Sequence, residues 1–220
     1  MERVAVELEG LVDALRIEAS AFPGSAAARR EMLVRMWSLR WALAPGARRR
    51  YLALATQFDL AGYGALRDLV YRWSVDDERH ERVAEAALWG LGADAIEAPL
   101  DAKLWDAYFD AIFVEQPWAT LGAMGAWEEL SAAAIDLARL AGSASRLAAM
   151  NFGAEVSRGS ELAETLRGEA LDPEEIAGLL EGISIAGVMG LRLTRWALGR
   201  EEEASGVRAW RISRWVAGQR

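Results

Sequence analysis

Three carboxylates and one imidazole are spaced to lie on otherwise apolar helix faces, where they could do chemistry. Glu128 and Glu155 each fall in helical register with apolar residues three, four or seven positions away. Asp77 and His80 are one helical turn apart, in register with Ala84. A buried charge must be paired, protonated or bound to a metal. Carboxylates and a histidine that point inward from facing helices are typical of metal sites in helical bundles. The sequence therefore offers a candidate site for iron or manganese formed by Asp77, His80, Glu128 and Glu155.

The same residues have alternative roles that need no metal. Buried among apolar residues, Glu128 or Glu155 is a candidate catalytic general acid or base acting on a bound small molecule. Asp77 can instead serve a helix terminus, and Glu155 can pair with Arg158 on the next turn. A lone histidine near the start of a helix is often a surface residue. These alternatives stay open at the level of sequence.

Composition excludes several other classes of site. The chain has 220 residues, 33 acidic against 25 basic, and a net charge of −8, which argues against nucleic-acid binding. It has no cysteine, which excludes disulfides, thiol catalysis and thiolate-bound metals, and its single histidine excludes paired-imidazole sites. We find neither a signal-peptide pattern nor a membrane-spanning stretch of uncharged apolar residues. We therefore expect a cytoplasmic protein with a small-molecule substrate or ligand and no membrane or nucleic-acid partner.

A cluster of aromatic residues gives a second candidate site. It is dense enough to line the pocket of a flat ligand, although in a chain with ten tryptophans such residues more often fill the core. Its members are Trp105, Tyr108, Phe109, Phe113, Trp118 and Trp127.

The elements that must position these residues are all helices. Apolar residues recur at spacings of three and four, and no stretch alternates in the manner of a strand. We predict one all-α bundle of seven or eight helices over residues 1–200. Residues 201–220 form an acidic turn followed by a basic, tryptophan-bearing end that packs on the body or on a partner. Expected helix boundaries are an end at Pro45-Gly46, starts at Asp76 or Asp77, at Asp101 and at Pro117, and a capping box at Asp172-Pro173-Glu174-Glu175.

Three segments carry a family resemblance that covers roughly residues 30–198. They are VYRWSVDDERHERVAEAALWGLGAD (70–94), EQPWATLGAMGAWEEL (115–130) and NFGAEVSRGSELAE (151–164). In their order and composition they resemble the haem-oxygenase-like superfamily, which includes thiaminase-II-like proteins and diiron oxidases. The resemblance implies a haem-oxygenase-like fold and a homodimer. In the diiron members it would imply two irons that activate oxygen to oxidise a small amino or fatty acid.

The ligand pattern of the diiron members is only partly present. Glu128 matches the acid of the central helix, and His80 with Asp77 matches the first ligand helix loosely. On the third helix the pattern falls on Glu155, Gly159 and Leu162, and neither glycine nor leucine can ligate a metal through its side chain. The resemblance therefore argues against a standard diiron site.

Taken together, the sequence predicts an enzyme that transforms a small molecule, in an oxidative or biosynthetic tailoring step. Its site uses an altered carboxylate and histidine set, either with iron or manganese or with no cofactor. The alternative is a non-catalytic helical protein that binds a ligand or partner and has lost the diiron site.

Overall fold

In a computed structural model, residues 2–19, 25–77, 80–140 and 158–200 are described, and these residues form helices and contain no strand. The expectation of an all-α bundle is thereby confirmed for this part of the chain. Glu155 and residues 201–220, including the basic end, lie outside the described residues. The helices are α1 (Glu2–Ala19), α2 (Ala26–Leu60), α3 (Gly64–Asp77), α4 (His80–Gly90), α5 (Leu100–Ile112), α6 (Pro117–Leu140), α8 (Arg158–Arg167) and α9 (Pro173–Ala197).

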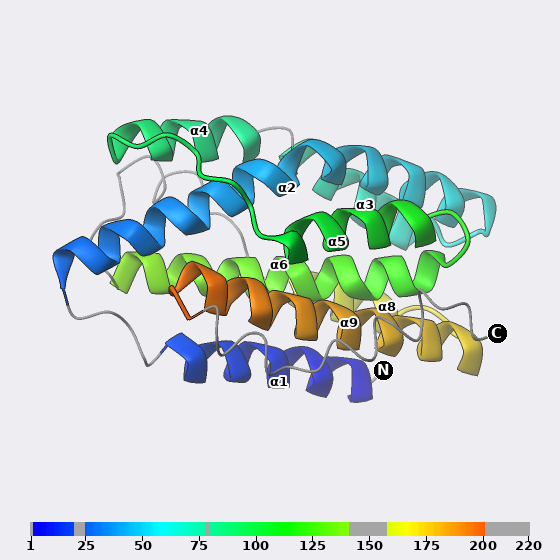
Figure 1. Cartoon of the computed structure of the whole chain (residues 1–220). Coiled ribbons are helices and arrows are strands. Elements are labelled where there is room, and N and C mark those ends of the chain that lie inside the picture. The colour runs from blue at the N-terminus through cyan, green and yellow to red at the C-terminus, as the bar shows by residue number, and fades with distance from the viewer. Residues whose placement is uncertain (1, 20–24, 78–79, 141–157, 201–220) are drawn as a thin grey trace.

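The helices pack around the pair α6 and α9. Figure 1 shows α9 between α1 and α6, and α6 between α9 and the long helix α2. Helix α4 covers the N-terminal half of α2, while α3 and α5 flank its C-terminal half. Among the described helices, α9 is long and apolar enough to cross a membrane by length and composition. It packs against α6 and α1, and 44% of its apolar stretch is buried in the bundle.

Helices α6 and α9 approach each other through glycine. A Cβ atom on Gly182 would lie 1.9 Å from the carbonyl oxygen of Ala119, and one on Gly122 would lie 2.1 Å from that of Leu179. Backbone atoms cannot move aside as a flexible side chain can. Gly182 of α9 and Gly122 of α6 therefore permit the close contact of the two helices.

Helix α2 runs through Pro45-Gly46, so the prediction that a helix ends there is wrong. Pro45 has no N–H to donate to the carbonyl of Trp41, which ordinarily weakens a helix at that point. Buried residues on both sides of it, including Leu43 and Tyr51, nevertheless pack into the same core. Tertiary packing thus outweighs the local cost of the proline. Gly46 leaves room for the guanidinium of Arg50, since a Cβ there would meet it at 2.6 Å.

Two other predicted starts are also wrong. Asp77 is the last residue of α3 and does not open the following helix. Helix α5 has Pro99 as its N-cap, and Asp101 in its first turn instead forms two hydrogen bonds with the guanidinium of Arg192 on α9, at 2.8 and 3.0 Å. Both acids have the sequence pattern of an N-cap residue. In the structure Asp77 instead contacts His80, and Asp101 contacts Arg192.

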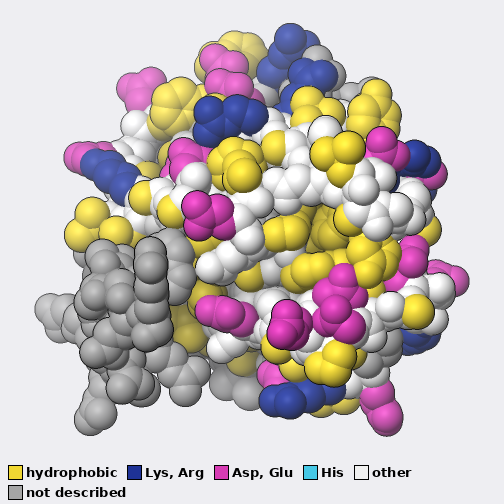
Figure 2. All heavy atoms as spheres, turned by 90° about the vertical axis from the view of Figure 1, so that its right-hand side faces the viewer, with side chains coloured by type: hydrophobic (Ala, Val, Ile, Leu, Met, Phe, Trp, Pro, Cys, Tyr) yellow, Lys and Arg dark blue, Asp and Glu magenta, His cyan; other side chains and the backbone are white. Residues whose placement is uncertain are grey.

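The expected capping box of α9 is confirmed. The Asp172 carboxylate accepts hydrogen bonds from the backbone N–H groups of Glu174 and Glu175, and the Glu175 carboxylate accepts one from the N–H of Asp172. Glu175 also accepts a 2.6 Å hydrogen bond from the hydroxyl of Tyr63, which lies in the turn between α2 and α3. Figure 2 faces this end of the bundle, where hydrophobic side chains gather in a hollow with Asp and Glu side chains around it.

We expect Gly182→Ala to lower the free energy of unfolding by about 2 kcal/mol or more, since overpacking a core costs about 1–3 kcal/mol and here the clash is with backbone. Gly10→Ala in α1 is the matched control, because its Cβ would meet nothing within 4 Å. That variant should gain about 0.5–1 kcal/mol from helix propensity. Urea unfolding of both variants measures the difference, and equal effects would contradict the close approach of α6 and α9.

The contact between Tyr63 and Glu175 predicts an unusual alkaline titration. The hydrogen bond to Glu175, with burial and the nearby carboxylates, raises the pKa of Tyr63 from 10.0 to about 12. The folded state thus favours the neutral phenol. The contribution of this contact to the stability of the fold is fully present below pH 10 and is lost as the pH rises toward 12. The ultraviolet absorbance of tyrosinate should therefore show a transition near pH 12 that Tyr63→Phe removes. In Glu175→Gln the transition should move toward pH 10, and an unmoved transition would count against the contact.

Candidate functional site

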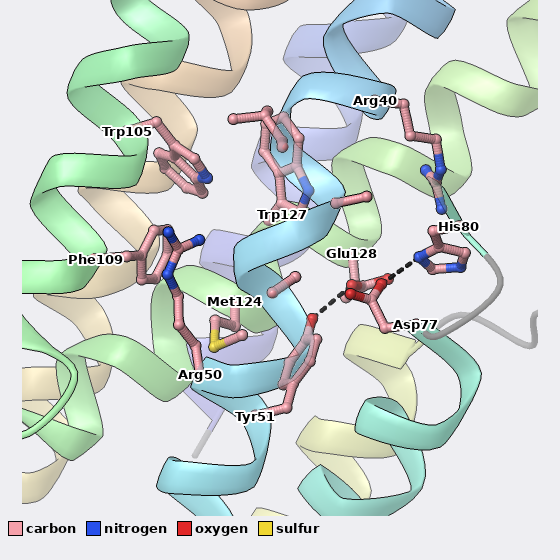
Figure 3. Close-up of a pocket in the computed structure, with 13 residues that line it drawn as sticks. Arg40, Arg50, Tyr51, Asp77, His80, Trp105, Phe109, Met124, Trp127 and Glu128 are labelled. Carbon is pink, nitrogen blue, oxygen red and sulfur yellow. Dashed lines mark hydrogen bonds and ion pairs between the residues drawn. The ribbon is translucent and has the colours of Figure 1, made fainter. Parts of the chain in front are cut away.

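Three of the four residues expected to form a site line one cavity. These are Asp77, His80 and Glu128, and the cavity lies between α2, α5 and α6 at the junction of α3 with α4. All three side chains are buried. The fourth expected residue, Glu155, lies outside the described residues. Figure 3 shows the cavity with the residues that line it.

Asp77 and His80 form an ion pair between Oδ1 and Nδ1 across the junction of two helices. Asp77 ends α3 and His80 begins α4. The expected spacing of one turn is therefore present as a direct contact between the last residue of α3 and the first residue of α4. A carboxylate at Nδ1 fixes the orientation of the imidazole and makes Nε2 the basic nitrogen of the neutral ring.

Glu128 accepts a 2.6 Å hydrogen bond at Oε1 from the hydroxyl of Tyr51, and both side chains are almost fully buried. Tyr51 belongs to α2 and was not singled out from the sequence. It shares one face of α2 with Arg40, Ala44 and Ala47, at offsets that follow the helical period, and all of these residues line the cavity. A polar residue on an otherwise apolar helix face is the pattern that could have indicated Tyr51. Because the sequence predicts that the helix ends at Pro45, Tyr51 was not assigned to the same face as Arg40.

Aromatic side chains form one wall of the cavity. Trp105 lies with its ring centroid 4.5 Å from that of Phe109 and 5.0 Å from that of Trp127. These three line the cavity, whereas Trp118 packs against Phe58 and does not. The cavity measures about 40 Å³, room for on the order of three water molecules. A flat aromatic ligand does not fit that volume, so the aromatic cluster acts mainly as core.

Arg50 closes the cavity toward α5. Its guanidinium lies 2.8 Å from the Asp106 carboxylate and 3.1 Å from that of Asp110, and stacks over the Phe109 ring at 5.6 Å. The side chain is only 5% exposed, while the two carboxylates reach solvent. This arrangement satisfies a buried cation with partners on a neighbouring helix.

One oxygen in the cavity has no hydrogen-bond donor among the described residues. It is Oδ2 of Asp77, whose other oxygen contacts His80. A buried carboxylate oxygen without a donor is costly, and active sites are where such groups gather. The atom is available to accept a hydrogen bond from a bound molecule.

The described donor set does not fit a metal ion. Asp77 and His80 engage each other, Glu128 engages Tyr51, and no three metal-ligating side chains among the described residues are placed to share one ion. We therefore derive no step through a metal from these residues.

Comparison of the chain with protein-family models, with curated proteins and with solved structures gives no match. The haem-oxygenase-like resemblance thus stays a prediction. The chemistry of the cavity rests on its own residues.

The chain has a single histidine, which makes the pair of Asp77 and His80 directly observable by nuclear magnetic resonance. At a pH where the ring is neutral, long-range proton–nitrogen correlation should show the proton on Nδ1, because the Asp77 carboxylate accepts it. In Asp77→Asn the amide can present either its oxygen or its nitrogen, so the preference for this tautomer should be lost.

Glu85→Gln is the matched control for this measurement, because it removes a carboxylate from the exposed face of α4. It should leave the tautomer unchanged. A ring protonated on Nε2 in the unsubstituted protein would contradict the geometry of the pair.

Proposed function

We propose that the protein is an enzyme that transforms a small molecule by general acid–base catalysis in this cavity. The observation that carries the proposal is the convergence of two hydrogen-bonded pairs, Tyr51 with Glu128 and Asp77 with His80, on one buried space. Figure 3 shows these four side chains directed toward one another from α2, α6 and the junction of α3 with α4. Keeping two carboxylates buried is costly, which argues for a use.

Each pair has a distinct role in the proposed mechanism. His80 accepts a proton from the substrate, and Asp77 orients the ring and stabilises the imidazolium that forms. Glu128 is the second group that exchanges a proton, and the hydroxyl of Tyr51 fixes the orientation of its carboxyl group. The aromatic wall of Trp105, Phe109 and Trp127 keeps bulk water from these groups.

This proposal keeps part of the expectation from sequence and narrows it. The catalytic role expected for Glu128 is retained, and that of Glu155 stays a prediction because the residue is outside the described part of the chain. A haem-oxygenase-like fold is compatible with the helical bundle and is part of the proposal. Acid–base chemistry is preferred over a metal-dependent oxidation because the described donors contact each other or Tyr51.

The test is a ligand and substrate screen followed by three matched variants. Glu128→Gln and Asp77→Asn should each lower kcat by about 10²–10⁴-fold, the usual contribution of a general acid or base. Glu129→Gln makes the same change one position along α6, at a residue that does not line the cavity, and should keep kcat within about twofold. Circular dichroism and unfolding curves establish that all three variants are folded.

Two outcomes would overturn the proposal. One is turnover that survives both Glu128→Gln and Asp77→Asn in folded protein. The other is stoichiometric binding of Fe(II) or Mn(II) that Glu128→Ala abolishes, since that result would show that Glu128 is a metal ligand. A ligand that binds in the cavity with no turnover of any compound screened would favour the non-catalytic alternative.

A further inference from the structure

A surface groove of about 400 Å³ lies beside the cavity, between α2 and the segment that leads into α5. Its volume falls in the range of pockets that bind small molecules. Trp41 and Ile96 are its large exposed apolar residues, each about 40% exposed. The other residues that line it are Ala42, Leu43, Ala95, Glu97, Ala98, Ala102, Lys103 and Asp106.

The far wall of the groove is fixed to α2 by hydrogen bonds. The backbone N–H of Ile96 donates to the buried hydroxyl of Ser38 at 3.0 Å. Farther along the same segment, the guanidinium of Arg30 donates to the carbonyl oxygens of Leu91 and Gly92 at 2.7 and 3.0 Å. The segment between α4 and α5 is not helical, so these contacts give it a defined course. The groove is therefore formed before anything binds in it.

The groove and the cavity share a boundary made of side chains. Leu43 lines both of them. Asp106 lines the groove and binds Arg50, which lines the cavity. Since Leu43 borders both spaces, a change of its side-chain rotamer is the smallest movement by which we expect the two to join.

The charges around the joined space favour a cation. Among the described residues that line the cavity or the groove, four are acidic (Asp77, Glu97, Asp106 and Glu128) and three are Lys or Arg (Arg40, Arg50 and Lys103). The oxygen without a donor, Oδ2 of Asp77, calls for an N–H or O–H group. An ammonium or amidinium supplies both the charge and the donor.

We propose that the groove binds the apolar body of a small amphipathic organic cation, whose ammonium or amidinium head passes Leu43 and reaches Asp77 in the cavity. The body lies against Trp41 and Ile96, and the head takes the hydrogen-bond position at Oδ2 of Asp77. This inference rests on the proposed function for its choice of cavity and names the substrate class that the cavity would take. The volume of the cavity suits a head group, and that of the groove suits the rest of the molecule.

The experiment uses the only lysine of the chain, Lys103, which lies in the groove, and the only histidine, which lies in the cavity. Reductive methylation with ¹³C-formaldehyde gives Lys103 a methyl signal and keeps its charge. Hexylamine is titrated as the probe, with hexanol and hexanoate as neutral and anionic controls of equal length. Hexylamine should shift the signals of Lys103 and His80 with one common Kd, at least about tenfold lower than that of either control.

Variants separate the two parts of the site. Trp41→Ala should weaken hexylamine binding about tenfold through loss of apolar contact, whereas Trp89→Ala, at an exposed tryptophan of α4, should not change it. Ala95→Trp fills the groove from an exposed position and should abolish the shift at His80. Asp77→Asn should weaken hexylamine and leave hexanol unchanged.

Equal binding of the three probes, or a shift at Lys103 with none at His80, would overturn the inference. These readouts measure binding without turnover. If hexylamine binds as expected while Glu128→Gln leaves turnover of a substrate intact, the proposed catalysis fails and the cation site stands. If turnover depends on Glu128 and hexylamine does not bind, the catalysis stands and the cation site fails.

Discussion

The close approach of α6 to α9 is the constraint on which the site depends. Gly122 and Gly182 bring the two backbones together on one side of α6. The opposite side of the same helix carries Met124, Trp127 and Glu128 toward the cavity. A helix fixed by backbone contact on one face can hold an acid in a defined position on the other, and precise placement of this kind is what catalysis and specific binding require.

The two buried acids of the cavity are each stabilised by a polar partner. Glu128 receives the hydroxyl of Tyr51, and Asp77 receives the imidazole of His80. Tyr51 and Glu128 come from α2 and α6, so that pair forms only when these helices pack together, whereas Asp77 and His80 are three residues apart in the chain. Arg50 is satisfied in the same way by two carboxylates of α5. The polar groups of the cavity thus link the helices while the aromatic wall keeps them from solvent.

The sequence predicts much of this arrangement where the signal is local. The helical class, the capping box at Asp172 and the inward position of Glu128 all follow from spacing and residue type. The course of α2 through Pro45 and the role of Tyr51 do not, because both depend on packing against helices distant in sequence. Spacing placed Asp77 and His80 one turn apart, and the structure has them in direct contact. Contacts between helices distant in sequence, such as that of Tyr51 with Glu128, are set by the tertiary structure and leave no period in the chain.

The difference in size between the cavity and the groove has a consequence for the proposed chemistry. A space of about 40 Å³ admits only a reacting group, while the groove of about 400 Å³ holds the remainder of a molecule. Binding free energy gained along Trp41 and Ile96 can then offset the cost of bringing a charged head past Leu43 into a buried site. In such a site, the groove selects the substrate and the two hydrogen-bonded pairs act on it. Substitutions in the groove should therefore alter which molecules are accepted, whereas substitutions at Glu128 or His80 alter the reaction itself.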